Sequence, residues 1–224
     1  MIIDTHSHCY WDTLLPRIDE ILRDMKAHNI THAIQSGCDI ETTEQALQLA
    51  RDYGEHFRAT VGYHPEHAQN CTLESVERDL IVLDQMIANN REIVVAVGEC
   101  GLDYHYLTDN RENEIAVQRF AWKRQVELGN KYNLPLVIHS RDAREDTLAF
   151  MRDNDIQFAI MHCYAEDYPF ACELMKLSPD IYFSFSGVVT YKSAPLIQEA
   201  AQKIPLHRIL IETDAPFLSP QPVR

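Results

Sequence analysis

The chain has 224 residues, of which 46% are hydrophobic, and this is enough to bury a sizeable core. Its 34 acidic and 20 basic residues give a formal net charge of −14, which excludes a broad basic surface that would hold a nucleic-acid backbone. No apolar run reaches the roughly 18 residues that span a bilayer, and the start of the chain lacks signal-peptide order, so we expect a cytoplasmic protein without membrane contact.

Short apolar runs with the composition of strands recur along the whole chain. They cover residues 2–8, 31–37, 57–64, 93–99, 134–140, 157–163, 181–187 and 208–214. Helical patterns lie between them: apolar residues repeat at i, i+3, i+4 and i+7 from Ile18 to Met25, and similarly from Val76 to Ile87. This alternation predicts a (β/α)8 TIM barrel formed by one domain, residues 1–224, with a doubly wound open sheet as the alternative.

The last ten residues, 215–224, contain three prolines and are not expected to form a helix. The barrel would then lack its eighth helix, and apolar surface between the last and first strands would be exposed. We therefore expect the native polypeptide to continue beyond Arg224.

Potential metal ligands occur where the predicted strands end. Asp4, His6 and His8 alternate along the first run and so project to one face of that strand. Each such residue alone could be an ordinary strand-end or surface group, but the carboxyl ends of barrel strands meet at one mouth, where barrel active sites lie. The full set is His6, His8, His64, Glu99, His139, His162 and Asp214.

Four imidazoles and two carboxylates suit two divalent ions that share a bridging carboxylate and activate a water for hydrolysis. We assign one ion to His6, His8, Glu99 and Asp214, and a second to Glu99, His139 and His162. Asp214 is also expected to accept the proton of the attacking water, and Asp4 to support the two imidazoles next to it. Imidazole ligands favour zinc, manganese or cobalt over magnesium, and the identity of the ion stays open.

Six motifs together resemble one known family. DTHSH (4–8), VGYHP (61–65), GECGLDYH (98–105), IHSR (138–141), MHCY (161–164) and ETDAPFL (212–218) are similar to the motifs of the TatD family of metal-dependent hydrolases and deoxyribonucleases, which have amidohydrolase-like barrels. The resemblance implies the same six metal ligands, of which we expect Glu99 and Asp214 to be catalytic. It also implies 3'-5' exonuclease activity on single-stranded DNA. Glu166 departs from the family pattern after the sixth strand, where a glycine is usual.

Two further residues are candidates for substrate contact. Arg141 can pair with two phosphate oxygens, although a solvent-exposed charge at a helix start is the alternative. His64 is expected to bind phosphate, or else to order its loop, and Asp103 and Tyr104 to shape the loop after the fourth strand. The expected partner is a single-stranded DNA end or another phosphodiester. A deacylase or amidohydrolase acting on an ester or amide bond is the alternative, and a binding module without activity ranks last.

Overall fold

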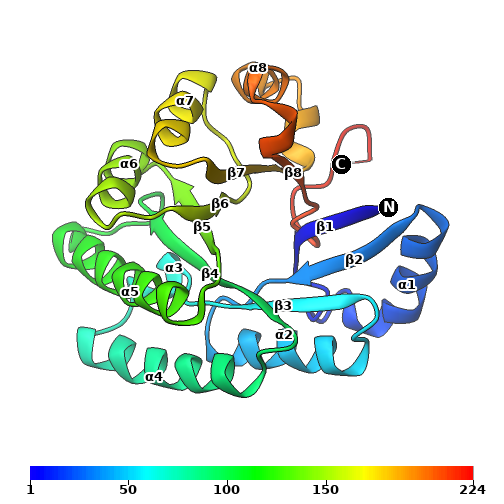
Figure 1. The fold of residues 1–224 in the computed structure, drawn as a ribbon, viewed down its shortest axis with the longest axis horizontal. Helices are drawn as coiled ribbons and strands as arrows, with labels where there is room; N and C mark the ends of the chain where they lie inside the picture. Colours follow the sequence, from blue (N-terminus) through cyan, green and yellow to red (C-terminus); the bar gives the residue numbers. More distant parts are fainter. Residues whose placement is uncertain (224) are drawn as a thin grey trace.

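In the computed structural model, which describes residues 1–223, eight parallel strands form one sheet in the order β1 to β8 (Figure 1). The order and the parallel pairing confirm the predicted barrel and exclude the doubly wound alternative. The strands are β1 (Ile2–Ser7), β2 (Ile30–Gln35), β3 (Phe57–Val61), β4 (Val94–Asp103), β5 (Leu136–Arg141), β6 (Phe158–Met161), β7 (Asp180–Phe185) and β8 (Ile209–Ile211).

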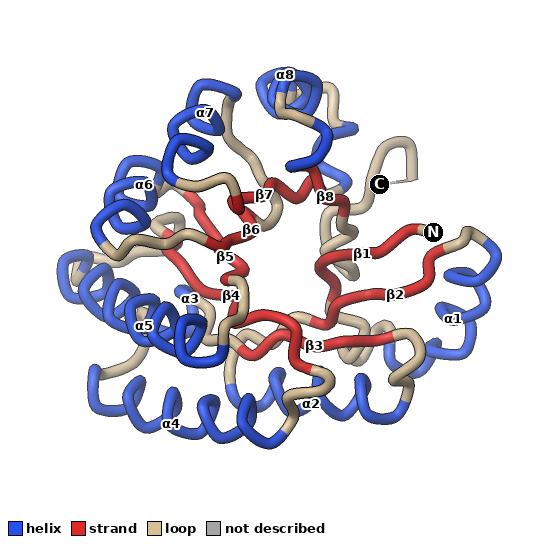
Figure 2. Tube along the Cα trace, viewed as in Figure 1, coloured by secondary structure: helices blue, strands red, loops and turns tan. Residues whose placement is uncertain are grey.

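Helices surround this sheet, and each strand from β1 to β7 is followed by at least one of them (Figure 2). The α-helices are α1 (Ile18–Ala27), α2 (Ile40–Asp52), α3 (Pro65–Ala68), α4 (Leu73–Asn89), α5 (Arg111–Tyr132), α6 (Arg144–Asp153), α7 (Tyr168–Leu177) and α8 (Pro195–Lys203). Three short 3-10 helices complete the set: η1 (Leu15–Arg17), η2 (Gly187–Thr190) and η3 (Leu206–Arg208). Among the described residues no helix follows β8, as the prolines of the tail predict.

Several helices begin where the local sequence supplies a cap. Asp39 accepts a hydrogen bond from the backbone N–H of Thr42 at the start of α2, and Thr72 does the same for Ser75 at the start of α4. Such caps satisfy backbone donors that have no partner within the helix. The apolar repeats then bury one face, since Ile18 of α1 and Val76 of α4 are both buried in the core.

The two edge strands, β1 and β8, are joined by individual hydrogen bonds near their carboxyl ends. Asp214 N donates to His6 O at 2.9 Å, and His8 N donates to Ala215 O at 2.8 Å. Thr5 Oγ1 also donates to Ile211 O at 3.0 Å. These bonds fix the end of β1 against the segment after β8, so residues from opposite ends of the chain are held together.

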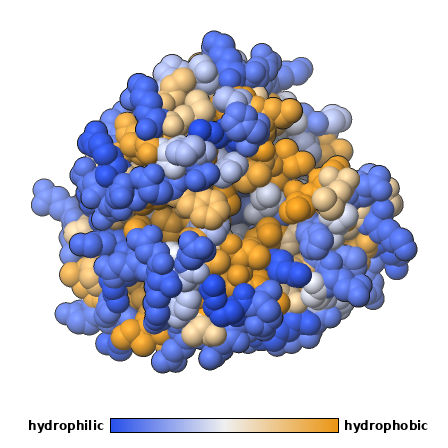
Figure 3. All heavy atoms as spheres, in the orientation of Figure 1, coloured by the Kyte–Doolittle hydropathy of each residue, from blue (hydrophilic) through white to orange (hydrophobic). Residues whose placement is uncertain are grey.

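Hydrophobic side chains fill the space between the sheet and the helices. Trp122 of α5 is completely buried and stacks on Phe150 of α6, with ring centroids 4.0 Å apart. On the face seen in Figure 3, hydrophobic residues gather towards the middle and hydrophilic residues cover the periphery. None of the helices in residues 1–223 is both long and apolar enough to cross a membrane.

Strand β4 continues to Asp103, four residues beyond its predicted end at Glu99. Two glycines allow the close approach that this path requires: Gly98 has a φ of +138°, and a Cβ at Gly62 would clash with the peptide between Gly98 and Glu99. Glu99 N in turn donates to Gly37 O at 3.0 Å. Residues that follow β2 and β3 therefore hold the backbone of Glu99 in position, independently of the contacts of its side chain.

Candidate metal centre

A cavity of about 880 Å³ opens at the carboxyl ends of the strands. Among the predicted site residues, its lining includes His8, His64, Glu99, His139, Arg141, His162 and Asp214. His6 does not line the cavity, because its side chain is fully buried. The structure thus brings together residues that are spread over more than two hundred positions of the sequence.

Glu99 lies at the centre of this group, with imidazoles from β1, β5 and the segment after β6 around it. Its Oε2 lies 3.4 Å from His6 Nε2, and its Oε1 lies 2.9 Å from His139 Nδ1 and 3.4 Å from His162 Nε2. His64 approaches the same oxygen, with its Nε2 at 3.2 Å. One buried carboxylate is therefore shared by four imidazoles.

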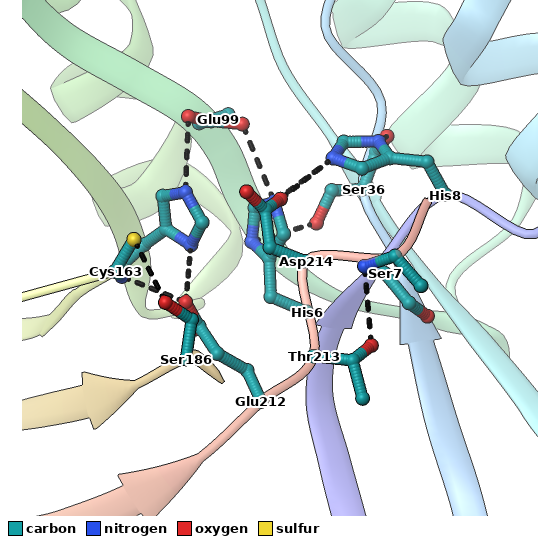
Figure 4. A network of polar contacts seen from close by, with 12 residues as sticks. His6, Ser7, His8, Ser36, Glu99, Cys163, Ser186, Glu212, Thr213 and Asp214 are labelled. Carbon is teal, nitrogen blue, oxygen red and sulfur yellow. Dashed lines mark hydrogen bonds and ion pairs between the residues drawn. The ribbon is translucent and has the colours of Figure 1, made fainter. Parts of the chain in front are cut away.

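Asp214 forms the second part of the site, next to the two histidines of the opening motif. Its Oδ1 lies 3.3 Å from His8 Nε2 and 3.7 Å from His6 Nε2, and the two Nε2 atoms are 3.2 Å apart. Figure 4 shows Glu99, His6, His8 and Asp214 converging from different elements of the barrel. His6 consequently belongs to both parts of the site.

The separations between donor atoms fit metal binding. Two ligands bound at about 2.0–2.1 Å to one tetrahedral ion are about 3.3 Å apart. The distances from Glu99 and Asp214 to their imidazoles range from 2.9 to 3.7 Å. The donors are imidazole nitrogens and carboxylate oxygens, which suit divalent transition ions. The residues present therefore fit such ions.

Three groups of donors have all their ligand atoms within 4.8 Å of one another. They are His6, Glu99 and His162; His6, His8 and Asp214; and His64, Glu99 and His139. All six predicted ligands occur in them, but among the described residues no such group holds His139 together with His162. The structure places His64 beside His139 instead, so His64, which our assignment of the two ions left out, joins the six donors.

The charges in the site are strongly coupled. Burial raises the pKa of Glu99, but the surrounding imidazoles, His162 and His64 foremost, outweigh it and hold that pKa well below its usual value. Burial opposes protonation of His162 and His139, yet nearby carboxylates raise their pKa values to about 10 and about 9. Asp214 also has a lowered pKa, because its imidazole neighbours more than offset its burial. The site therefore combines anionic carboxylates with two strongly basic imidazoles, those of His162 and His139.

Two further carboxylates contact the imidazoles through their other ring nitrogen. Asp103 Oδ2 lies 2.9 Å from His139 Nε2, and Glu212 Oε1 lies 3.0 Å from His162 Nδ1. Such contacts orient an imidazole ligand and raise its basicity. Sequence reasoning missed both roles: it expected Asp103 only to shape a loop. The contact of Asp103 depends on the extension of β4 beside β5, which carries His139, and the strand pattern of the sequence did not indicate that extension.

The histidines of the opening motif are held by polar groups in the segments that follow β1 and β2. His6 Nδ1 lies 3.0 Å from Ser36 Oγ, and His8 Nδ1 lies 2.8 Å from Tyr10 Oη. Asp4 does not contact either ring. Its carboxylate accepts hydrogen bonds from Thr213 N at 3.0 Å and Thr213 Oγ1 at 2.6 Å, so it joins β1 to the segment after β8. It also accepts a hydrogen bond from His6 N at 3.3 Å, so the support that we expect Asp4 to give the imidazoles acts through the backbone and not through a contact with either ring.

The two predicted substrate residues take different positions. Arg141 lines the cavity at the end of β5, with its guanidinium 5.1 Å from the centre of the Tyr106 ring. His64 accepts a hydrogen bond from Glu66 N at the start of α3, at 3.1 Å, while its other nitrogen faces Glu99. His64 thus orders its loop and contributes to the donor cluster. Phosphate contact by either residue stays a prediction.

The chain is similar in sequence and in structure to several known proteins. A family model described as TatD related DNase matches residues 3–224. The chain is 34% identical over 226 residues to the uncharacterized metal-dependent hydrolase YabD of Bacillus subtilis (strain 168), covering 100% of this chain and 84% of that protein. It is 31% identical over 232 residues to the uncharacterized metal-dependent hydrolase YcfH of Escherichia coli (strain K12), covering 100% of this chain and 80% of YcfH. The crystal structure of YjjV, a TatD homolog from Escherichia coli K12, matches with a TM-score of 0.87 and 25% identity, over 99% of this chain and 82% of YjjV.

Proposed function

This chain belongs to the TatD-related DNase family of metal-dependent hydrolases, and from that membership we propose that it shortens single-stranded DNA from the 3' end, using two divalent ions. The observation that carries the proposal is the position of Glu99. One buried carboxylate contacts four imidazoles at the floor of an open cavity. That arrangement suits a bridging ligand between two ions.

Divalent ions bound at these donors would lower the pKa of a water and neutralise charge that develops during displacement at phosphorus. The chain itself supplies the proton acceptor. Asp214 lies beside His8 and lines the cavity, and its lowered pKa keeps it anionic. Its position in the cavity lets it accept a proton from a water there. Asp103 and Glu212 hold the rings of His139 and His162 in place during turnover.

Arg141 favours a phosphodiester over an ester or amide substrate. It is a cation that lines the same cavity as Glu99 and Asp214, and a guanidinium can pair with two phosphate oxygens in a fixed geometry. The net charge of −14 is unfavourable for binding along a nucleic-acid strand. We therefore propose that the protein holds only a few nucleotides at the end of a strand.

The proposal is tested with 5'-labelled single-stranded DNA incubated with manganese or magnesium. We expect a ladder of shortened products that keep the label, and EDTA should abolish it. Glu99→Ala should abolish it too, whereas Glu92→Ala, an exposed glutamate before β4, should cleave like the unmodified protein. If no metal supports cleavage while an aminoacyl ester is turned over, the deacylase alternative replaces the nuclease.

A further inference from the structure

We infer that Trp11 and Phe217 form a shelf on which a base at the 3' end of a DNA strand stacks. This aromatic shelf, defined as these two side chains, lies at the mouth of the cavity that holds the metal donors. The inference rests on the proposed function, because it assigns the binding site for one part of the proposed substrate. It adds a role for two residues that are not metal donors.

The ring of Trp11 packs on the ring of Phe217, which in turn lies beside the metal donor His8. The ring centroids of Trp11 and Phe217 are 5.4 Å apart with an interplanar angle of 85°. Phe217 in turn lies 6.1 Å from the ring of His8, at 69°. Because the two rings are nearly perpendicular, a base that stacks on the face of one ring meets the edge of the other, next to the part of the site formed by His8 and Asp214.

Both rings are exposed at the mouth of the cavity. Trp11 is 44% exposed and Phe217 is 46% exposed, although their neighbours His8 and Tyr10 are buried. Large aromatic surfaces in water at a cavity mouth are suited to binding a flat apolar ligand. Bases stack on such side chains with little regard to sequence, because every base has a π-face.

Backbone hydrogen bonds hold the shelf in position. Trp11 N donates to His8 O at 3.1 Å, and Trp11 O accepts from Leu14 N and Leu15 N, both at 2.8 Å. Phe217 N donates to Asp214 O at 2.8 Å. Each ring therefore belongs to a turn that begins at a metal-donor residue. A site that is ordered before binding loses less entropy when the ligand arrives.

The location of the cationic side chain identifies the ligand as a nucleotide. Trp11 follows β1 and Arg141 ends β5, and these strands are four apart in the order of an eight-stranded barrel, so they lie on opposite sides of the mouth. The carboxylates and imidazoles lie between them. A ligand that fits has an anionic centre with a flat aromatic group on one side, which describes a nucleotide better than an acyl or peptide group.

The protein contains its own fluorescent reporter for this contact, since Trp11 and Trp122 are its two tryptophans. Trp122 is fully buried against Phe150 and serves as an internal reference. We expect a short single-stranded DNA with a phosphorothioate-protected 3' end to quench the emission of the magnesium-loaded protein. Quenching should disappear in Trp11→Phe. A strand whose last two positions are abasic should need about tenfold higher concentration to bind.

Kinetics separate the shelf from the catalytic groups. Trp11→Ala should raise KM for single-stranded DNA about tenfold with little change in kcat, and Trp11→Phe should restore most of the loss. Phe158→Ala is the matched control, because Phe158 is also 46% exposed but begins β6 at the opposite end of the barrel. An abasic 3' end should raise KM for the unmodified protein and have no effect on Trp11→Ala.

The outcomes distinguish the two proposals. If DNA is cleaved but neither Trp11→Ala nor the abasic end changes KM, the shelf is overturned and the nuclease stands. If base-dependent quenching occurs without cleavage under any metal, the nuclease fails and the shelf is supported. If there is neither cleavage nor quenching, both proposals are wrong.

Discussion

Asp103 Oδ2 lies 2.9 Å from His139 Nε2, while Nδ1 of the same ring lies 2.9 Å from Glu99 Oε1. His139 is thus held between two carboxylates, of which only Glu99 belongs to a donor group. A carboxylate behind an imidazole ligand fixes the orientation of the ring and increases its basicity. Asp103 is therefore a positioning residue for the metal site.

Replacing Asp103 with asparagine should lower metal affinity or activity by roughly 10- to 100-fold, as is typical when a partner of a metal ligand is lost. Metal titration by calorimetry, together with steady-state kinetics, measures both. Asp109→Asn is the control, since Asp109 is exposed in the loop that follows β4. Wild-type metal affinity and activity in Asp103→Asn would exclude this role.

Asp214→Asn should lower kcat by about 10²- to 10⁴-fold, because the proposed proton acceptor is lost. The backbone bond from residue 214 to His6 O does not depend on the side chain, so the fold should persist. Measuring kcat beside metal content and thermal stability checks this. A variant that keeps most of its kcat would show that Asp214 does not accept the proton.

The metal-free protein should become less stable as pH rises from about 6.5 towards 10. The pKa values of His139 and His162 are raised from 6.5 to about 9 and about 10, so the folded state binds protons more tightly than the unfolded state. This contribution is complete below pH 6.5 and is lost as pH passes through the folded-state values. Thermal unfolding in EDTA across this range measures it.

Glu212→Gln is the matched variant for the pH prediction, because Glu212 is the strongest influence that raises the pKa of His162. It should show a shallower decline of stability with pH. Stability that is constant or rises between pH 6.5 and 10 in the metal-free protein would contradict the assigned pKa directions.

Arg141→Ala should raise KM for single-stranded DNA by about tenfold or more, the loss typical of a hydrogen bond to a charged group. Arg141→Lys should recover only part of it, because an ammonium cannot form the paired contact of a guanidinium. Arg152→Ala controls for the loss of one positive charge, since Arg152 is exposed on α6 and pairs only with Asp153 among the described residues. An unchanged KM in Arg141→Ala would exclude phosphate binding there.

The arrangement of strands and the meeting of the donors could be predicted from the sequence, because both follow from local rules. Apolar periodicity located the strands, and a parallel barrel brings their carboxyl ends together. This is sufficient to gather His6 from β1, His139 from β5 and Asp214 from the segment after β8.

The partners behind the donors could not be predicted, because they depend on which side chains face each other across strands. The strand pattern ended β4 at Glu99, which left Asp103 in a loop, whereas the strand runs on beside β5. The position of His64 next to Glu99 similarly depends on the close packing of β3 on β4 at Gly62. Neither contact leaves a periodic signal in the sequence.

Anomalous diffraction from crystals grown with manganese tests the central claim most directly. We predict two peaks about 3.5–4 Å apart, one on each side of the Glu99 carboxylate, and the loss of at least one of them in Glu99→Ala. A single peak, or two peaks of which neither contacts Glu99, would contradict the account.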